Sequence, residues 1–351
     1  MRELAGVIVH KLGLYGLSVL ILSVGICDSI ASGLRATAVG SWPLLNTSLP
    51  TEGAVRGELA KLQSETGLTL AWYEDGLHMV IFKDRSVLRA KPVPGSNGEE
   101  GAVSWDGTKI AMDFHSGEFA QRKVSLGVVQ PDGKDLQEFP GIFATDICWS
   151  RDNSKLALTM YKPANTSLGI LDLSSKLITN IVSNVDIASN IHRNEHFTSQ
   201  CWSQDDKQIV YQYNGNVRIL DAAKPVTSDR ILTQGFHPTW SPDGVWIAFF
   251  DDNAYYAIRP NGDERRELFR TAGATSGLYW SPDSRVVAFV SLVGPLEGVS
   301  TLDAESYRLR VRHLQDQSED WVAMDVSSIN YQWVTNRHLL ERLDSENSPS
   351  H

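Results

Sequence analysis

Four aspartates recur in one short setting, and carboxylates can serve as general acids or bases or as calcium ligands. The aspartates are Asp152, Asp205, Asp243 and Asp283, and the tryptophans that begin the same motif are Trp149, Trp202, Trp240 and Trp280. Each aspartate lies two residues after a serine, where an aspartate normally closes an Asx-type hydrogen bond in its own turn. We therefore predict that all four are structural turn residues.

Histidines and cysteines near the same motif offer other chemistry. His196 and His237 precede two of the tryptophans, and we predict that they line the mouth of a channel, where an imidazole would titrate near neutral pH. Cys148 and Cys201 directly precede motif tryptophans in successive repeats. Because equivalent atoms in neighbouring repeats are usually too far apart for a disulfide, we predict two buried free thiols, with one bridge as the alternative.

No Cys/His spacing typical of a metal site and no Ser/His/Asp set stands out in the sequence. We therefore predict no catalytic residue, no metal and no cofactor.

The motif is the start of an internal repeat. Its best copy is Pro238-Thr239-Trp240-Ser241-Pro242-Asp243-Gly244, followed by the apolar run Val245–Phe250. The degenerate copies are Val103-Ser104-Trp105-Asp106-Gly107 and Trp333-Val334-Thr335-Asn336. The four aspartates are 53, 38 and 40 residues apart, a spacing that suits one four-stranded propeller blade. In each copy the turn joins two strands, and two further short strands follow before the next copy.

The repeated tryptophans could form an aromatic binding cage. A tryptophan at one blade position more often packs adjacent blades together, so we predict that these side chains belong to the core.

The pattern Trp-Ser-Pro-Asp-Gly, with its following apolar strand, resembles the repeat of TolB-like β-propellers over about residues 68–343. The resemblance implies an all-β propeller that binds a protein partner. It does not extend to a full-length TolB, since residues 39–66 are too few for the additional α/β domain. The Gly-x-Ser-x-Gly turn of propeller-bearing peptidases is absent from the sequence.

Ring closure is predicted from both ends of the repeat region. Residues 102–327 supply five blades, and strands within Leu68–Pro92 and Ser328–Arg342 would combine into a sixth. Alternatively, Trp72-Tyr73-Glu74-Asp75-Gly76 begins a repeat of its own and adds a seventh blade. We predict six blades.

The N-terminal region is typical of an export signal. The uncharged run Leu12–Cys27 follows Arg2 and Lys11, and small residues at Ala31 and Ala38 suit cleavage. Residues 4–27 would act as a membrane anchor if retained. We predict a signal or anchor over residues 1–38, a linker with one short helix over 39–66, the propeller over 67–343 and a disordered tail over 344–351.

The net charge of −10 and the pI of about 5.4 leave no basic face for nucleic acid. The alternation of Arg308, Arg310 and Arg312 is typical of a solvated strand face. We therefore predict a periplasmic or extracellular module that binds a protein or peptide without catalysis. Two alternatives stay open, a sugar- or peptide-acting hydrolase or lyase with its site in the channel, and a sensor or scaffold domain of a membrane-anchored complex.

Overall fold

The structure is a computed structural model of the chain. All of its described helices and strands lie in one compact unit of residues 46–351. The residues that the structure describes are 53–94, 96–116, 123–162, 165–186, 198–271, 276–293, 306–324, 326 and 330–347. The predicted signal or anchor therefore lies outside the described residues.

Short strands dominate the described residues, as the repeat predicted. The first seven are β1 Leu68–Glu74, β2 Leu77–Ile81, β3 Ser86–Arg89, β4 Ser96–Val103, β5 Ile110–Ser116, β6 Lys123–Val129 and β7 Gln137–Pro140. The next eight are β8 Ala144–Trp149, β9 Lys155–Lys162, β10 Asn165–Asp172, β11 Ile178–Asp186, β12 Thr198–Trp202, β13 Gln208–Tyr213, β14 Asn216–Asp221 and β15 Arg230–Gln234. The last nine are β16 Phe236–Trp240, β17 Ile247–Asp251, β18 Ala254–Ile258, β19 Arg266–Arg270, β20 Tyr279–Trp280, β21 Val286–Val293, β22 Ser306–His313, β23 Glu319–Met324 and β24 Gln332–Thr335. Three helices accompany them, α1 Ala54–Thr66, α2 Pro225–Ser228 and α3 Arg337–Asn347.

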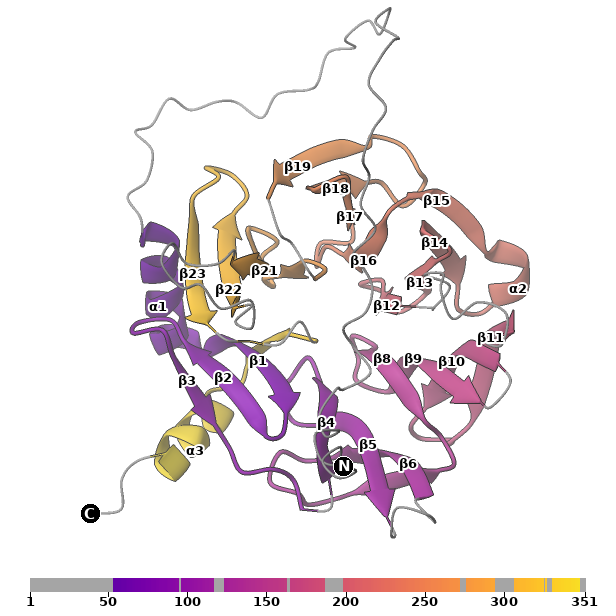
Figure 1. Cartoon of the computed structure of the whole chain (residues 1–351), viewed down its shortest axis with the longest axis horizontal. Coiled ribbons are helices and arrows are strands. Elements are labelled where there is room, and N and C mark those ends of the chain that lie inside the picture. The colour runs from indigo at the N-terminus through magenta and orange to yellow at the C-terminus, as the bar shows by residue number, and fades with distance from the viewer. Residues whose placement is uncertain are drawn as a thin grey trace, which may run out of the picture. The chain divides into compact units, whose positions relative to one another are not determined.

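The strands pair antiparallel within small sheets. Four sheets hold four strands each, namely β8–β11, β12–β15, β16–β19 and β20–β23, in chain order. A larger sheet runs β3-β2-β1-β4-β5-β6-β7, and β24 adds to it by pairing with β1. Figure 1 shows these sheets following one another around a common centre. The prediction of repeated four-stranded antiparallel sheets is confirmed.

One turn recurs after the first strand of successive repeats. The motif serine donates its hydroxyl to the carboxylate of the aspartate two residues later, over 2.5–2.8 Å. The pairs are Ser104–Asp106, Ser150–Asp152, Ser203–Asp205, Ser241–Asp243 and Ser281–Asp283. The same serine oxygen accepts the backbone N–H five residues after it, for example that of Lys155 at 2.8 Å. Hydroxyl and carboxylate together therefore satisfy the backbone of the chain reversal.

The residue after the turn aspartate links one repeat to the previous one. It has a positive φ of 56° at Asn153, 56° at Asp206 and 59° at Ser284. Its side chain accepts a backbone N–H of the previous turn: Asn153 from Trp105, Asp206 from Arg151 and Asp152, and Ser284 from Asp243. The turns thus connect neighbouring sheets as well as neighbouring strands.

Apolar side chains fill the space between consecutive sheets. The second strand of a repeat is largely buried, as Ile247, Ala248 and Phe249 of β17 show with 0% exposure. Trp149, Trp202, Trp240, Trp280 and Trp333 are 1–6% exposed and belong to five different apolar clusters. Burial on both faces explains why the strands read as continuous apolar runs.

The two ends of the repeat region meet in one sheet. β24 pairs antiparallel with β1, with Leu68 opposite Thr335 and Leu70 opposite Trp333. Figure 1 shows the yellow C-terminal strands beside the indigo N-terminal ones. The predicted combination of N- and C-terminal strands is therefore present.

The C-terminal region differs from the prediction in two respects. The last motif copy is followed by helix α3, whereas the repeat predicted a strand near Leu339. Residues 344–347, predicted to be a disordered tail, belong to this helix. Leu339 and Leu343 lie four residues apart and are 6% and 0% exposed, so the helix is held by the apolar cluster around β1 and β5.

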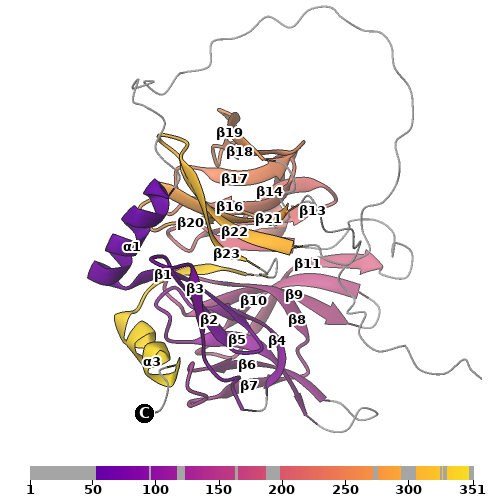
Figure 2. The ribbon, with the colours of Figure 1, turned by 60° about the vertical axis from the view of Figure 1, so that its left-hand side comes forward.

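Helix α1 packs against the strands where the chain closes (Figure 2). Val55 and Leu59 enter the apolar cluster between β22 and β1. Gln63 binds the backbone at the end of β2. Its Nε2 donates to Val80 O at 2.7 Å, and its Oε1 accepts the N–H of Phe82 at 3.1 Å. The helix within the predicted linker is thus part of the packed domain.

A buried carboxylate fastens α1 to the sheets. The Asp320 side chain, which is 0% exposed, pairs with Arg56 of α1 and with Arg85, each over 3.2 Å. Both partners are more than 20% exposed, so their guanidinium groups stay partly hydrated while the carboxylate is shielded.

None of the helices in the described residues has the length and apolar character needed to cross a bilayer.

We expect Ser241→Ala to lower the free energy of unfolding by about 1 kcal/mol, because it leaves the half-buried Trp246 N–H without its acceptor. Chemical denaturation of the two proteins measures the difference. Ser64→Ala on the exposed surface of α1 is the matched control and should change stability by less than about 0.5 kcal/mol. Equal effects of the two substitutions would contradict a stabilising role for the turn.

Candidate functional site

A cavity of about 230 Å³ lies where the first strands of the repeats converge. Residues of β4, β8, β12, β16, β20 and β24 all line it, among them Val103, Ile147, Cys201, Thr239, Tyr279 and Gln332. Two indole N–H groups connect neighbouring walls, since Trp149 donates to Ala102 O and Trp333 to Tyr279 O, each at 2.8 Å. The cavity is therefore held by rigid strands rather than by long loops.

Arg151 is the main cationic group of the cavity wall. Its guanidinium carbon lies 3.5 Å from the ring centroid of Trp105, a cation–π arrangement. Atoms Nε and Nη2 are enclosed and have no hydrogen-bond partner among the described residues. Burial lowers the pKa of Arg151, because the charged form loses hydration. This guanidinium retains hydrogen-bonding capacity.

Asp206 positions the backbone next to that guanidinium. Its Oδ1 accepts the Arg151 N–H at 2.7 Å, and its Oδ2 accepts the Asp152 N–H at 3.1 Å. Burial raises the pKa of Asp206, although both hydrogen bonds oppose that shift. The Asp206 carboxylate thus holds the backbone of Arg151 and thereby fixes the position from which the Arg151 side chain extends.

His237 lines the cavity. It has a φ of 51°, and its backbone N–H donates to Gln212 Oε1 at 3.0 Å. Burial lowers the pKa of its imidazole below the usual 6.5. The side chain is therefore neutral at pH 7. His196 lies outside the described residues.

Cys148 and Cys201 are both free, as predicted, although Cys148 is half-buried where a buried thiol was predicted. Both side chains line the cavity and pack in the same apolar cluster, so the two thiols share one site. β8 and β12 pack side by side at the centre, where blades converge and equivalent positions lie closer together than elsewhere in the sheets. Cys27 lies outside the described residues.

The predicted turn aspartates do not reach the cavity. Asp152, Asp205, Asp243 and Asp283 are held by the serine hydrogen bonds of their own turns. Within the described ranges, no group of three or more His, Cys, Asp or Glu side chains is placed to hold a metal ion.

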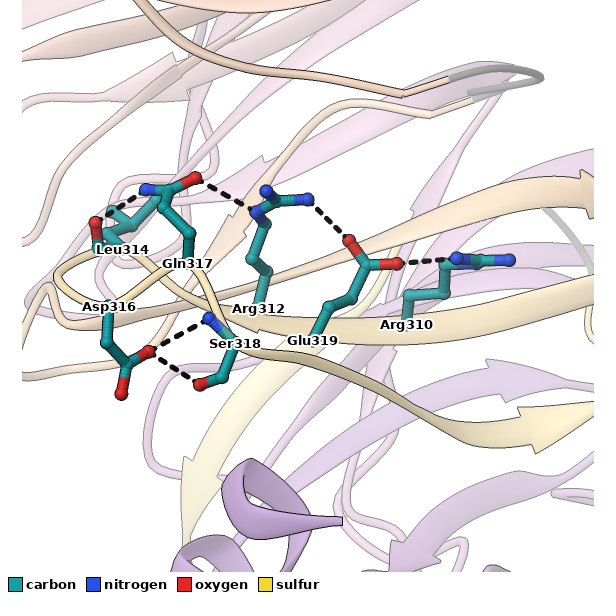
Figure 3. Close-up of polar contacts among 7 residues, drawn as sticks. All are labelled: Arg310, Arg312, Leu314, Asp316, Gln317, Ser318 and Glu319. Atoms are coloured by element: carbon teal, nitrogen blue, oxygen red, sulfur yellow. Dashed lines mark hydrogen bonds and ion pairs between the residues drawn. The ribbon is translucent and has the colours of Figure 1, made fainter. Parts of the chain in front are cut away.

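The arginine alternation on β22 is not simply solvated. Arg310 and Arg312 both pair with Glu319, over 2.5 and 2.7 Å, and Gln317 accepts a further hydrogen bond from Arg312 (Figure 3). The guanidinium carbon of Arg312 lies 4.5 Å from the centroid of the Phe269 ring in the adjacent sheet. Arg312 therefore packs against the adjacent sheet, and none of these side chains lines the cavity.

Sequence reasoning missed Arg151 and the contribution of Trp105 to the cavity. A signal did exist, because Arg151 occupies the motif position that is proline in Pro242 and Pro282. A charged residue where a turn prefers proline indicates a role other than turn formation.

We expect the imidazole of His237 to titrate below pH 6.5 in the folded chain. The unfolded chain then binds more protons below pH 6.5, so stability is complete above that pH and falls as the pH drops toward the folded pKa. The loss reaches at most about 1.4 kcal/mol per pH unit. Denaturation at pH 7.5, 6.5 and 5.5 measures it against His237→Asn, which tolerates the positive φ. Identical pH slopes for the two proteins would refute the shift.

Comparison with known proteins supports the fold. No family model and no curated protein sequence matches the chain. Among solved structures it is similar to a putative TolB from Agrobacterium tumefaciens, at 15% identity and a TM-score of 0.51, over 73% of this chain and 88% of that one. It is also similar to TolB from Acinetobacter baumannii, at 14% identity and a TM-score of 0.53, over 78% and 70% of the two chains. The chain therefore has a TolB-like β-propeller fold.

Proposed function

We propose that this chain is an exported, six-bladed β-propeller that binds a segment of a protein or peptide in its central cavity and does not itself catalyse a reaction. Six blades are supported by the strands that line the cavity, since β4, β8, β12, β16, β20 and β24 would each be the first strand of one blade. The pairing of β24 with β1 would complete the blade that contains β2 and β3.

The composition of the cavity is the observation that carries the binding proposal. Aromatic rings of Trp105, Tyr279 and Tyr331 lie beside polar groups of Arg151 and Asn330. Aromatic residues and arginine are the types that dominate binding energy at protein interfaces. A volume of about 230 Å³ is below the range of about 300–1,000 Å³ typical of small-molecule sites. It suits one or two side chains inserted by a larger partner.

Binding is favoured over hydrolysis by the charges in the cavity. Among the described residues that line it, Asp146 is the one with a carboxylate side chain, and His237 is neutral at pH 7 because burial lowers its pKa. Glycosidases generally need two carboxylates on either side of the bond. A rigid wall with a cation stacked on an indole supports recognition of a partner.

Export is proposed from the N-terminal sequence. The uncharged run Leu12–Cys27 with its preceding basic residues has the layout of a signal segment. The domain would then act in the periplasm or outside the cell, either released or held at the membrane through residues 4–27.

The binding proposal is tested by placing the photo-crosslinking residue p-benzoylphenylalanine in the full chain, in the cells that produce it. Substitution at Tyr331, in the cavity wall, should give a covalent adduct with one defined protein. Substitution at Leu177, which is 68% exposed on a turn, is the matched control and should not give that adduct.

Purified partner should then bind Trp105→Ala at least tenfold more weakly than the wild-type chain, because the substitution removes the indole that stacks on Arg151 in the cavity wall. Isothermal titration calorimetry measures the change. Unaltered affinity, or an adduct formed equally from Leu177, would refute binding at the cavity. Turnover of an oligosaccharide or peptide by the purified chain would refute the absence of catalysis.

Export is tested by fractionation and N-terminal sequencing of the mature chain. A cleaved signal predicts a start at Ser32 or Val39, after the small residues of the candidate sites, whereas a retained anchor predicts intact chain in the membrane fraction. Intact chain in the cytosolic fraction would contradict export.

A further inference from the structure

Two thiols meet in the wall of the central cavity. Cys148 is the penultimate residue of β8, and Cys201 is the penultimate residue of β12 in the next sheet. Cys201 is 9% exposed and belongs to an apolar cluster against which Cys148 also packs. Both side chains line the cavity, so a small reagent that enters it can reach them.

The surroundings of Cys201 stabilise a thiolate. The Thr239 hydroxyl lies 3.9 Å from its sulfur and donates to it, and Arg151 supplies a positive charge nearby. The hydrogen bond from Cys148, followed by the charge of Arg151 and against the effect of burial, lowers the pKa of Cys201 to about 6. The same contact, together with burial, raises the pKa of Cys148. Cys201 is therefore the nucleophilic thiol, and Cys148 stays protonated.

We propose that Cys148 and Cys201 form an oxidisable dithiol, which closes to a disulfide between neighbouring sheets by exchange with a small-molecule disulfide. Both side chains pack in the same apolar cluster and line the same cavity, and each strand is held by sheet pairing on its other side. Closure would join two side chains that already share one site.

The exchange balances in two steps. The Cys201 thiolate attacks one sulfur of the external disulfide, which forms a mixed disulfide and releases the first external thiolate. Cys148 then gives its proton to solvent, and its sulfur attacks the Cys201 sulfur. The Cys148–Cys201 bond forms, and the second external thiolate leaves. Overall, two protein thiols are oxidised, one disulfide is reduced, and two small thiols are produced.

Arg151 takes part in this site as a positioning residue. Asp206 fixes its backbone, and Trp105 stacks on its guanidinium, so the positive charge is held near both sulfur atoms. Oxidation removes the thiolate that this charge stabilises. Because these residues line the cavity, the oxidation state of the pair also alters the charge that the cavity presents.

The test uses the reduced full chain carrying Cys27→Ser, so that Cys148 and Cys201 are its two thiols. Iodoacetamide labelling of each cysteine is followed by peptide mass spectrometry at pH 6 and pH 8. Labelling of Cys201 should rise only about twofold, whereas an ordinary thiol with a pKa of 9.0 would rise about 100-fold. Arg151→Met should steepen the pH dependence at Cys201.

Oxidised glutathione is then added at pH 7. The expected product has lost two hydrogen atoms, contains a linked Cys148–Cys201 peptide, and has a Tm higher by about 5 °C. Cys148→Ser should stop at a glutathione adduct on Cys201, because the resolving sulfur is missing. Cys148→Ala gives a second version of this control.

Two outcomes would overturn the proposal. One is wild-type chain that keeps a stable glutathione adduct without forming the link. The other is a folded chain whose thiols do not react, while the unfolded chain does. These measurements do not depend on any partner, so they are independent of the proposed binding function.

Discussion

The hydrogen bond between the motif serine and the aspartate two residues later is the interaction on which the architecture depends. It closes the turn after the first strand of five repeats, for example between Ser203 and Asp205 over 2.8 Å. Each bond alone contributes about 1 kcal/mol. Its larger effect is geometric, because the next residue then adopts a positive φ and reaches the previous turn, as Asp206 does with Arg151.

Different kinds of side chain lie at the centre of the domain and between most of its sheets. The motif tryptophans and the apolar side chains of the second strands pack between consecutive sheets, where these side chains are almost fully buried. Where the first strands converge there is a cavity of about 230 Å³, with Arg151, His237 and two thiols in its wall beside several aromatic rings. The same convergence brings Cys148 and Cys201 into one apolar cluster.

The sequence predicted those features that depend on local chemistry. Serine, aspartate and a residue that accepts positive φ specify the turn within a few positions, so repeats, strand order and four-stranded sheets could be predicted from it. The cavity could not be, because Arg151 acquires its place from Trp105, 46 residues earlier, and from Asp206, 55 residues later. Helix α3 was missed although Leu339 and Leu343 have helical spacing, because a degenerate motif copy ahead of them indicated a strand.

The pairing of β24 with β1 has a consequence for the order of folding. Leu68 and Thr335 are neighbours in the sheet although 267 residues separate them in the chain. During synthesis the first hairpin emerges long before the strand that covers its edge, and contacts of such sequence separation form slowly. A chain that ended before Gln332 would leave the backbone donors and acceptors along β1 open to another molecule. The β24 pairing therefore covers an edge that another chain could otherwise join, and this sheet cannot be completed before residues Gln332–Thr335 have been synthesised.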